Sequence, residues 1–91
     1  MGRNLKKRIP NLLKKYRRVR GFSQREVARI LELESTSMIS RWESGLMLPS
    51  AINLFKLAAL YRVIVDALYF DFLGSLKEEL KTKEELIFGT K

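Results

Sequence analysis

The first 29 residues of the chain carry most of its positive charge. They contain eleven Lys and Arg residues and one acid, Glu26, whereas residues 30–91 contain seven bases and nine acids. A field concentrated in this way attracts a polyanion, which could be DNA, RNA or an anionic membrane. A solvated, solubilising face is the alternative interpretation. The eleven bases are Arg3, Lys6, Lys7, Arg8, Lys14, Lys15, Arg17, Arg18, Arg20, Arg25 and Arg29.

The side chains that enzymes use most often for proton transfer and metal binding are missing. The 91 residues include no cysteine and no histidine, which removes the commonest zinc ligands and the commonest general base. The remaining residue types form no convergent catalytic set. We therefore expect no enzyme, no metal and no cofactor, and a function in binding.

Helices must position these basic residues, because apolar residues recur at helical spacing along the chain and no clear strand pattern appears. Pro10 fits the first turn of a helix, and Ser23 with Glu26 forms a capping box. The polar run 35–37 supplies N-caps for a third helix. The expected helices span about 9–20, 23–31, 35–43, 49–61 and 66–72.

The segment after Gly74 has a different character. The capping-box signature occurs at 75–78 and again at 82–85, so the segment forms one helix or two short ones. Its apolar residues are too many for a free tail, and they either fold onto the domain or form a dimer seam. We expect a domain over residues 1–73 and a helical extension over 74–91. The apolar residues are Leu76, Leu80, Leu86, Ile87 and Phe88.

Membrane insertion and secretion are not expected. The sequence has no apolar run of the roughly 18 residues that a bilayer span needs, and the basic N-terminus is not followed by the apolar region of a signal peptide. These observations favour a cytoplasmic protein.

The ordered set of residues in 23–45 is the most specific signal in the chain. Together with two pairs further on, it resembles the Cro/repressor-type, XRE-like helix-turn-helix family over about residues 9–69. The resemblance implies an all-α fold: a five-helix lambda-repressor-like DNA-binding domain, here with a C-terminal helical extension. The matching residues are Ser23-Gln24, Val27-Ala28, Leu31, Ile39-Ser40-Arg41-Trp42-Glu43, Gly45, Pro49-Ser50 and Leu57-Ala58.

Two departures from the family pattern concern the turn after the second helix. The family usually has glycine where Glu32 stands, and it has one residue fewer between Leu31 and Ile39. The longer turn leaves the register of residues 34–36 open. Counting back from Glu43 avoids the insertion, and the assignments below follow that count.

The resemblance implies that the third helix enters the major groove, where the N-terminal residues of such a helix touch base edges. Thr36, Ser37 and Arg41 match the base-reading positions of the family, and Met38 lies beside them, where it can meet a thymine methyl group. Arg41 suits a bidentate contact with guanine. Trp42 is expected in the core, because duplex DNA offers it no unstacked base.

A second set of residues is expected to contact phosphates, namely Gln24, Ser35, Ser44 and Arg18. Gln24 and Ser44 match phosphate-contacting positions of the family, and Gln24 begins a helix whose free N–H groups can meet a phosphate. In the family, the glutamate that matches Glu43 pairs with an arginine near the end of the first helix. We therefore predict an ion pair between Arg17 and Glu43.

These assignments predict sequence-specific binding of double-stranded DNA by a transcriptional regulator, with repression expected more often than activation. The family implies a homodimer on a palindromic operator. Two alternatives remain open. One is an antitoxin-like module of the same fold whose main partner is another protein, and the other is non-specific binding of nucleic acid.

Overall fold

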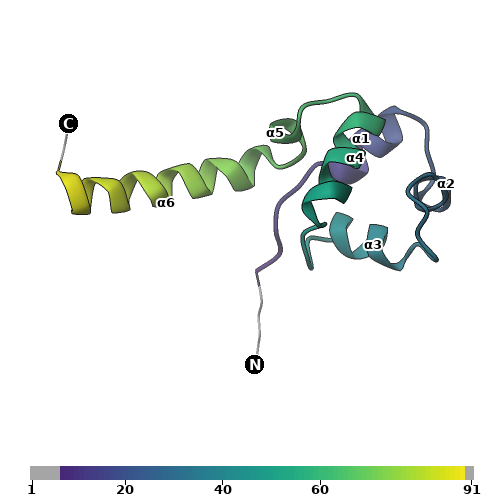
Figure 1. The fold of residues 1–91 in the computed structure, drawn as a ribbon, viewed down its shortest axis with the longest axis horizontal. Helices are drawn as coiled ribbons and strands as arrows, with labels where there is room; N and C mark the ends of the chain where they lie inside the picture. Colours follow the sequence, from purple (N-terminus) through teal and green to yellow (C-terminus); the bar gives the residue numbers. More distant parts are fainter. Residues whose placement is uncertain (1–6, 90–91) are drawn as a thin grey trace.

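The computed structural model describes residues 7–89, and within that range the chain forms six α-helices and no β-strand (Figure 1). The predicted all-α fold class is confirmed. Arg3 and Lys6, two of the eleven N-terminal bases, lie outside the described residues. In the part of the chain that is described, no helix is both long and apolar enough to cross a membrane. The helices are α1 (Leu13–Val19), α2 (Gln24–Ile30), α3 (Ser37–Glu43), α4 (Ala51–Tyr61), α5 (Val65–Leu68) and α6 (Phe70–Phe88).

Helix α2 begins where the capping box predicted. Ser23 Oγ accepts a hydrogen bond from the Glu26 amide at 3.0 Å, and Glu26 Oε1 accepts one from the Ser23 amide at 2.8 Å. Helix α4 begins in a similar way, since Ser50 Oγ accepts from the Asn53 amide at 3.3 Å. These side chains satisfy amides that have no partner inside a helix, and so they fix where each helix starts.

Helix α1 begins four residues later than predicted, and Pro10 precedes it instead of lying in its first turn. The reason is Asn11, whose Oδ1 accepts from the Leu13 amide at 3.0 Å while Nδ2 reaches the carbonyl of Trp42 at 3.2 Å. The amide of Ile9 donates to the carbonyl of Gly45 at 2.8 Å. Ile9 and Asn11 are therefore bound to α3 and its end, while the Leu12 amide donates to the Leu68 carbonyl of α5, and these bonds compete with helix formation.

Four successive helices end with the same hydrogen-bond pattern around one residue of positive φ. That residue is Gly21 after α1 (φ 79°), Glu32 after α2 (φ 62°), Gly45 after α3 (φ 80°) and Arg62 after α4 (φ 62°). At the end of α2, the Glu32 amide donates to Arg29 and the Leu33 amide donates to Ala28, at 3.1 and 2.8 Å. This is the Schellman motif, which prefers glycine at the left-handed position. Glu32 and Arg62 occupy this position although their Cβ atoms make the left-handed conformation unfavourable.

The core lies where α1 to α5 meet, and its largest fully buried side chain is Trp42. Trp42 and Ile39 of α3 are each 1% exposed, as is Leu57 of α4. Gly45 has no room for a side chain, because a Cβ there would meet the Ile9 carbonyl oxygen at 2.5 Å. The other buried apolar residues are Leu13, Val27, Ala28, Leu31, Ala58, Tyr61, Leu68 and Tyr69.

The extension is one continuous helix, and it starts before Gly74. The predicted fifth helix is shorter than expected, since α5 ends at Leu68 and α6 begins at Phe70. Ser75 and Thr82 do not cap helices, because their hydroxyls donate to the carbonyls of Asp71 and Glu78 one turn earlier, at 3.3 and 3.1 Å. Helix α6 extends away from α1 to α5 and has no buried residue (Figure 1).

Candidate nucleic-acid interface

Helices α2 and α3 form a helix-turn-helix unit whose inner faces are apolar. Val27 and Ala28 of α2 are 0% and 4% exposed, and they meet the buried face of α3 formed by Ile39 and Trp42. Alanine is small enough to let two helices approach closely, and Ala28 is buried on the inner face of α2. The burial of both inner faces fixes which side of α3 is turned to solvent.

The outward face of α3 carries Ser37, Ser40 and Arg41, all of which are exposed. Arg41 lies one turn after Ser37, so the two side chains share this face. The Arg41 guanidinium has no hydrogen bond or ion pair with the described residues. Ser40 was not among the predicted site residues, although its spacing of three from Ser37 places it on the same face.

Thr36 and Met38 are less accessible than Ser37 and Arg41. Both are partly buried, and Met38 packs against the core. Thr36 is the N-cap of α3, but its side chain makes no capping hydrogen bond. Instead, Ser35 Oγ accepts from the Ser37 amide at 3.2 Å. Of the four base-reading candidates, Ser37 and Arg41 are thus the two that the fold exposes most.

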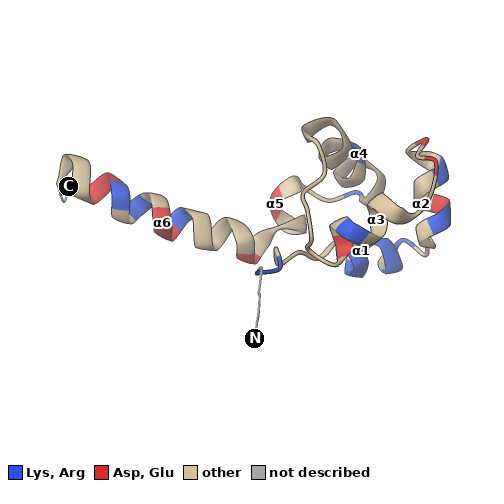
Figure 2. Cartoon of the chain, turned by 90° about the horizontal axis from the view of Figure 1, so that it is seen from below, with Lys and Arg blue, Asp and Glu red and all other residues tan. Residues whose placement is uncertain are grey.

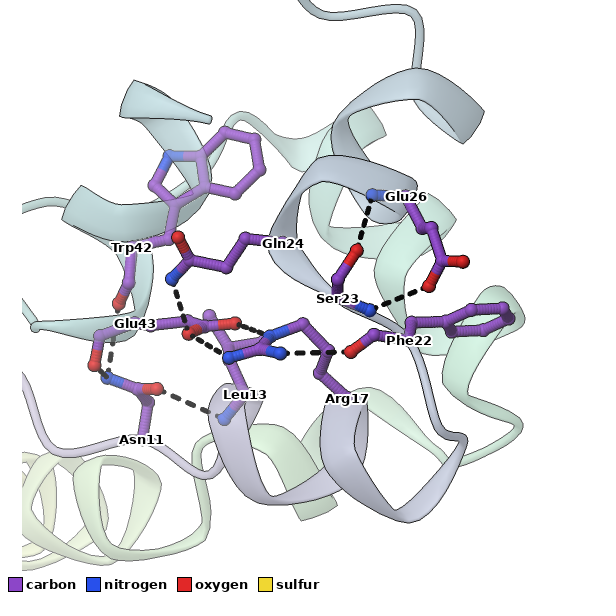
Figure 3. A network of polar contacts seen from close by, with 9 residues as sticks. All are labelled: Asn11, Leu13, Arg17, Phe22, Ser23, Gln24, Glu26, Trp42 and Glu43. Atoms are coloured by element: carbon purple, nitrogen blue, oxygen red, sulfur yellow. Dashed lines mark hydrogen bonds and ion pairs between the residues drawn. The ribbon is translucent and has the colours of Figure 1, made fainter. Parts of the chain in front are cut away.

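Glu43 lies at the centre of a polar network that joins three helices (Figure 3). Arg17 Nε donates to Glu43 Oε2 at 2.6 Å and Arg17 Nη2 donates to Oε1 at 3.1 Å. Arg17 Nη1 donates to the Phe22 carbonyl at 2.9 Å. The two side chains are 9% and 5% exposed, so the structure contains a nearly buried, bidentate ion pair at the expected positions.

The charges of this network shift the titration of their neighbours. The hydrogen bond to Glu43 raises the pKa of Arg17, with burial acting in the opposite direction. Burial, with the Glu43 charge as a second cause, raises the pKa of Tyr61 well above its usual value. Arg17 is therefore charged and Tyr61 neutral at any pH where DNA binding is measured.

Gln24, the first residue of α2, joins the same network. Its Nε2 donates to Glu43 Oε1 at 3.0 Å, and the residue is partly buried. The sequence predicted only a phosphate contact for Gln24 and gave no sign of this bond, because the partner lies 19 residues away. Nε2 carries a second hydrogen that this bond does not use, so the side chain keeps one donor that is not bound to Glu43.

The remaining phosphate candidates lie on different parts of the domain. Ser44 follows α3, where its Oγ donates to the Arg41 carbonyl at 3.1 Å. Its own carbonyl accepts from Arg8 Nη1 at 3.0 Å, which adds a cation beside the C-terminus of the helix. Ser35 lies in the turn before α3, and Arg18 is exposed on α1. Arg18 therefore does not belong to the α2–α3 unit.

Basic residues dominate the end of the molecule formed by α1 and α2, whereas α6 alternates between basic and acidic residues (Figure 2). Among the described residues, no group of three or more acidic side chains is arranged to hold a metal ion. The exposed bases of α1 and α2 thus lie on the two helices that pack against α3.

A family model described as helix-turn-helix matches residues 13–67, which is more than half of the chain. No curated protein and no solved structure matches it. The matched range begins with α1 and ends within α5, so it contains the complete α2–α3 unit and leaves α6 outside. The chain belongs to the XRE-like helix-turn-helix family, and its α1 to α5 form a DNA-binding domain of that family.

Proposed function

We propose that the protein binds specific sequences of double-stranded DNA as a homodimer and regulates transcription, with repression as the expected mode. In this proposal α3 enters the major groove, with Ser37 and Arg41 facing base edges and with Thr36 and Met38 beside them. Each copy reads one half of a palindromic site. This role would place the protein in the cytoplasm.

The observation that carries the proposal is the division of α3 into two faces. Ile39 and Trp42 are each 1% exposed, while Ser37 and Arg41 on the other side are exposed. A helix that is anchored on one side by the core presents its polar side in a fixed orientation. Such preorganisation lowers the entropy lost when side chains meet base edges.

Phosphate contacts would set the register of α3 in the groove. Gln24 begins α2 and Ser44 follows α3, and the hydrogen bond from Gln24 to Glu43 brings these two ends together on one side of the unit. Ser35 and Arg18 are the further candidates for this role. The excess of bases in residues 1–29 adds attraction that depends little on sequence.

Selection of bound sequences from a random duplex library, with the full chain as bait, tests the proposal. We expect enrichment of two inverted half-sites whose centres are about one helical turn apart. The affinity for the enriched site should exceed that for random DNA by roughly 10³-fold or more. A pool that stays random after selection would instead support non-specific binding of nucleic acid.

An antitoxin-like role, in which another protein is the main partner, is the second candidate. It is favoured by the apolar side chains that α6 exposes, among them Leu80 (62%), Leu86 (81%) and Ile87 (72%). Limited proteolysis separates the two roles. If α6 is cleaved as fast in the dimer as in the monomer, its apolar face stays exposed in the dimer and is free to bind a different protein, as the antitoxin-like role requires.

A further inference from the structure

Helix α6 carries one apolar stripe that is partly buried at Leu73 and Leu76 and exposed along the rest of the helix. Positions 73, 76, 80, 83 and 87 follow each other at spacings of three or four residues, which places them on one side of the helix. Four of them are Leu73, Leu76, Leu80 and Ile87. Leu80 and Ile87 are 62% and 72% exposed. The stripe has the form of a helix-pairing seam.

The fifth position of the stripe is Lys83, whose ammonium group is paired with a carboxylate at the edge of the stripe. Lys83 Nζ contacts Glu79 Oε2 at 3.2 Å, one turn earlier on the flank of the stripe. The aliphatic stem of the lysine therefore remains available to cover apolar surface while its ammonium group stays at the edge. Lys83 weakens the seam without interrupting it.

The charges beside the stripe differ between its two flanks. Lys77 and Glu84 each follow a stripe position by one residue, so they lie on the same flank. Glu79 and Leu86 each precede a stripe position and lie on the opposite flank. In paired helices these flanking residues set the orientation of the partner.

A parallel pair of α6 helices would place Glu79 of one copy beside the partner's Glu84, twice by symmetry, and like charges repel. An antiparallel pair can place Lys77 beside the partner's Glu84, again twice, and these charges attract. From this difference we propose that α6 pairs antiparallel with α6 of a second copy of this chain, with Lys77 facing the partner's Glu84. The inference deepens the homodimer of the proposed function and rests on it.

This register has a definite packing. Leu76 faces the partner's Ile87, and Leu80 faces the stem of the partner's Lys83. At a rise of 1.5 Å per residue, the two α6 helices then begin roughly 35 Å apart, with the DNA-binding domains at opposite ends of the pair.

Charge reversal distinguishes the two orientations. In the antiparallel pair, Glu84→Lys brings a second ammonium group beside Lys77 of the opposite copy, whereas in a parallel pair it creates an attraction to Glu79. We expect sedimentation equilibrium of the full chain at low salt to show a dimer dissociation constant about tenfold higher for Glu84→Lys. The double variant Lys77→Glu/Glu84→Lys should return it close to the starting value.

Glu85→Lys is the matched control, because it makes the same charge change on the side of α6 opposite the stripe. Its dissociation constant should stay within about twofold of that of the parent chain. Three results would overturn the antiparallel pair: a monomer at all concentrations, a tighter dimer for Glu84→Lys, or equal effects of Glu84→Lys and Glu85→Lys. If the full chain still prefers the duplex recovered by selection over random-sequence DNA in those cases, the proposed reading of base edges stands and only the pairing of α6 is wrong.

Discussion

Gln24 donates a hydrogen bond to Glu43 and so ties the first residue of α2 to the last residue of α3. The accepting oxygen, Oε1, also receives a hydrogen bond from Arg17. The carboxylate that holds α1 therefore also orients a side chain at the edge of the proposed DNA-binding surface. Glu43 therefore affects both the stability of the domain and its recognition surface, because a shift of Glu43 would move the start of α2 relative to α3.

Arg17→Ala should destabilise the domain strongly. The substitution leaves the Glu43 carboxylate, which is 5% exposed, without its main partner. An uncompensated buried charge costs roughly 3–5 kcal/mol, and urea unfolding measures that loss directly. Arg18→Ala, next to it on the exposed side of α1, is the control and should change the free energy of unfolding by less than about 0.5 kcal/mol. Equal stability of Arg17→Ala and the parent chain would contradict the structural role of the ion pair.

Glu32→Gly should stabilise the domain by about 1 kcal/mol. Glu32 has a φ of 62° at the left-handed position of the Schellman motif, where a side chain is strained and glycine is not. Thermal unfolding of the two proteins measures the gain. Glu34→Gly removes a carboxylate from the same turn at a residue without positive φ, so it should bring no gain. A lower midpoint for Glu32→Gly than for the parent chain would show that the turn is not strained at this residue.

Stability should fall at alkaline pH because of buried tyrosines. Burial raises the pKa of Tyr69 from 10.0 to about 12. The folded chain therefore keeps a proton that the unfolded chain loses, and stability that is intact below pH 10 is lost as the pH rises toward 12. Tyr61, whose pKa is also raised, adds to the same trend.

Tyr69→Phe isolates the Tyr69 contribution. The hydroxyl of Tyr69 is buried and has no hydrogen-bond partner among the described residues, so its removal should change stability at neutral pH by less than about 1 kcal/mol. Urea unfolding between pH 10 and 12 should show a smaller loss for Tyr69→Phe than for the parent chain. Identical losses in both proteins would assign the alkaline effect to other groups.

Local patterns predicted the parts of the fold that local chemistry determines. The Ser23–Glu26 capping box and the burial of Trp42 follow from neighbouring residues or from helical spacing, and the structure contains both. The family resemblance added the Arg17–Glu43 pair, whose residues lie 26 positions apart. It also singled out Glu32, where the structure has a left-handed residue.

The failures came from partners distant in sequence or from ambiguous signals. Asn11 delays the start of α1 because it bonds to Trp42 and Glu43, and no local pattern reveals those contacts. Ser75 and Thr82 have capping-box spacing, yet the residues before each of them are already helical. Their hydroxyls therefore donate to carbonyls one turn earlier in α6 and cap no new helix. A capping box therefore predicts a helix start only where the preceding residues leave the helical conformation.

The central claim is that the exposed face of α3 reads base edges, and the affinity of Arg41→Ala for two DNA duplexes tests it most directly. With the site recovered by selection, loss of a bidentate contact should cost roughly 1–3 kcal/mol, whereas random DNA should lose much less. Lys56→Ala removes one charge from the exposed surface of α4 and serves as the control, with small and equal losses on both duplexes. Equal losses on both duplexes for Arg41→Ala would contradict base reading by this face and reduce Arg41 to a phosphate contact.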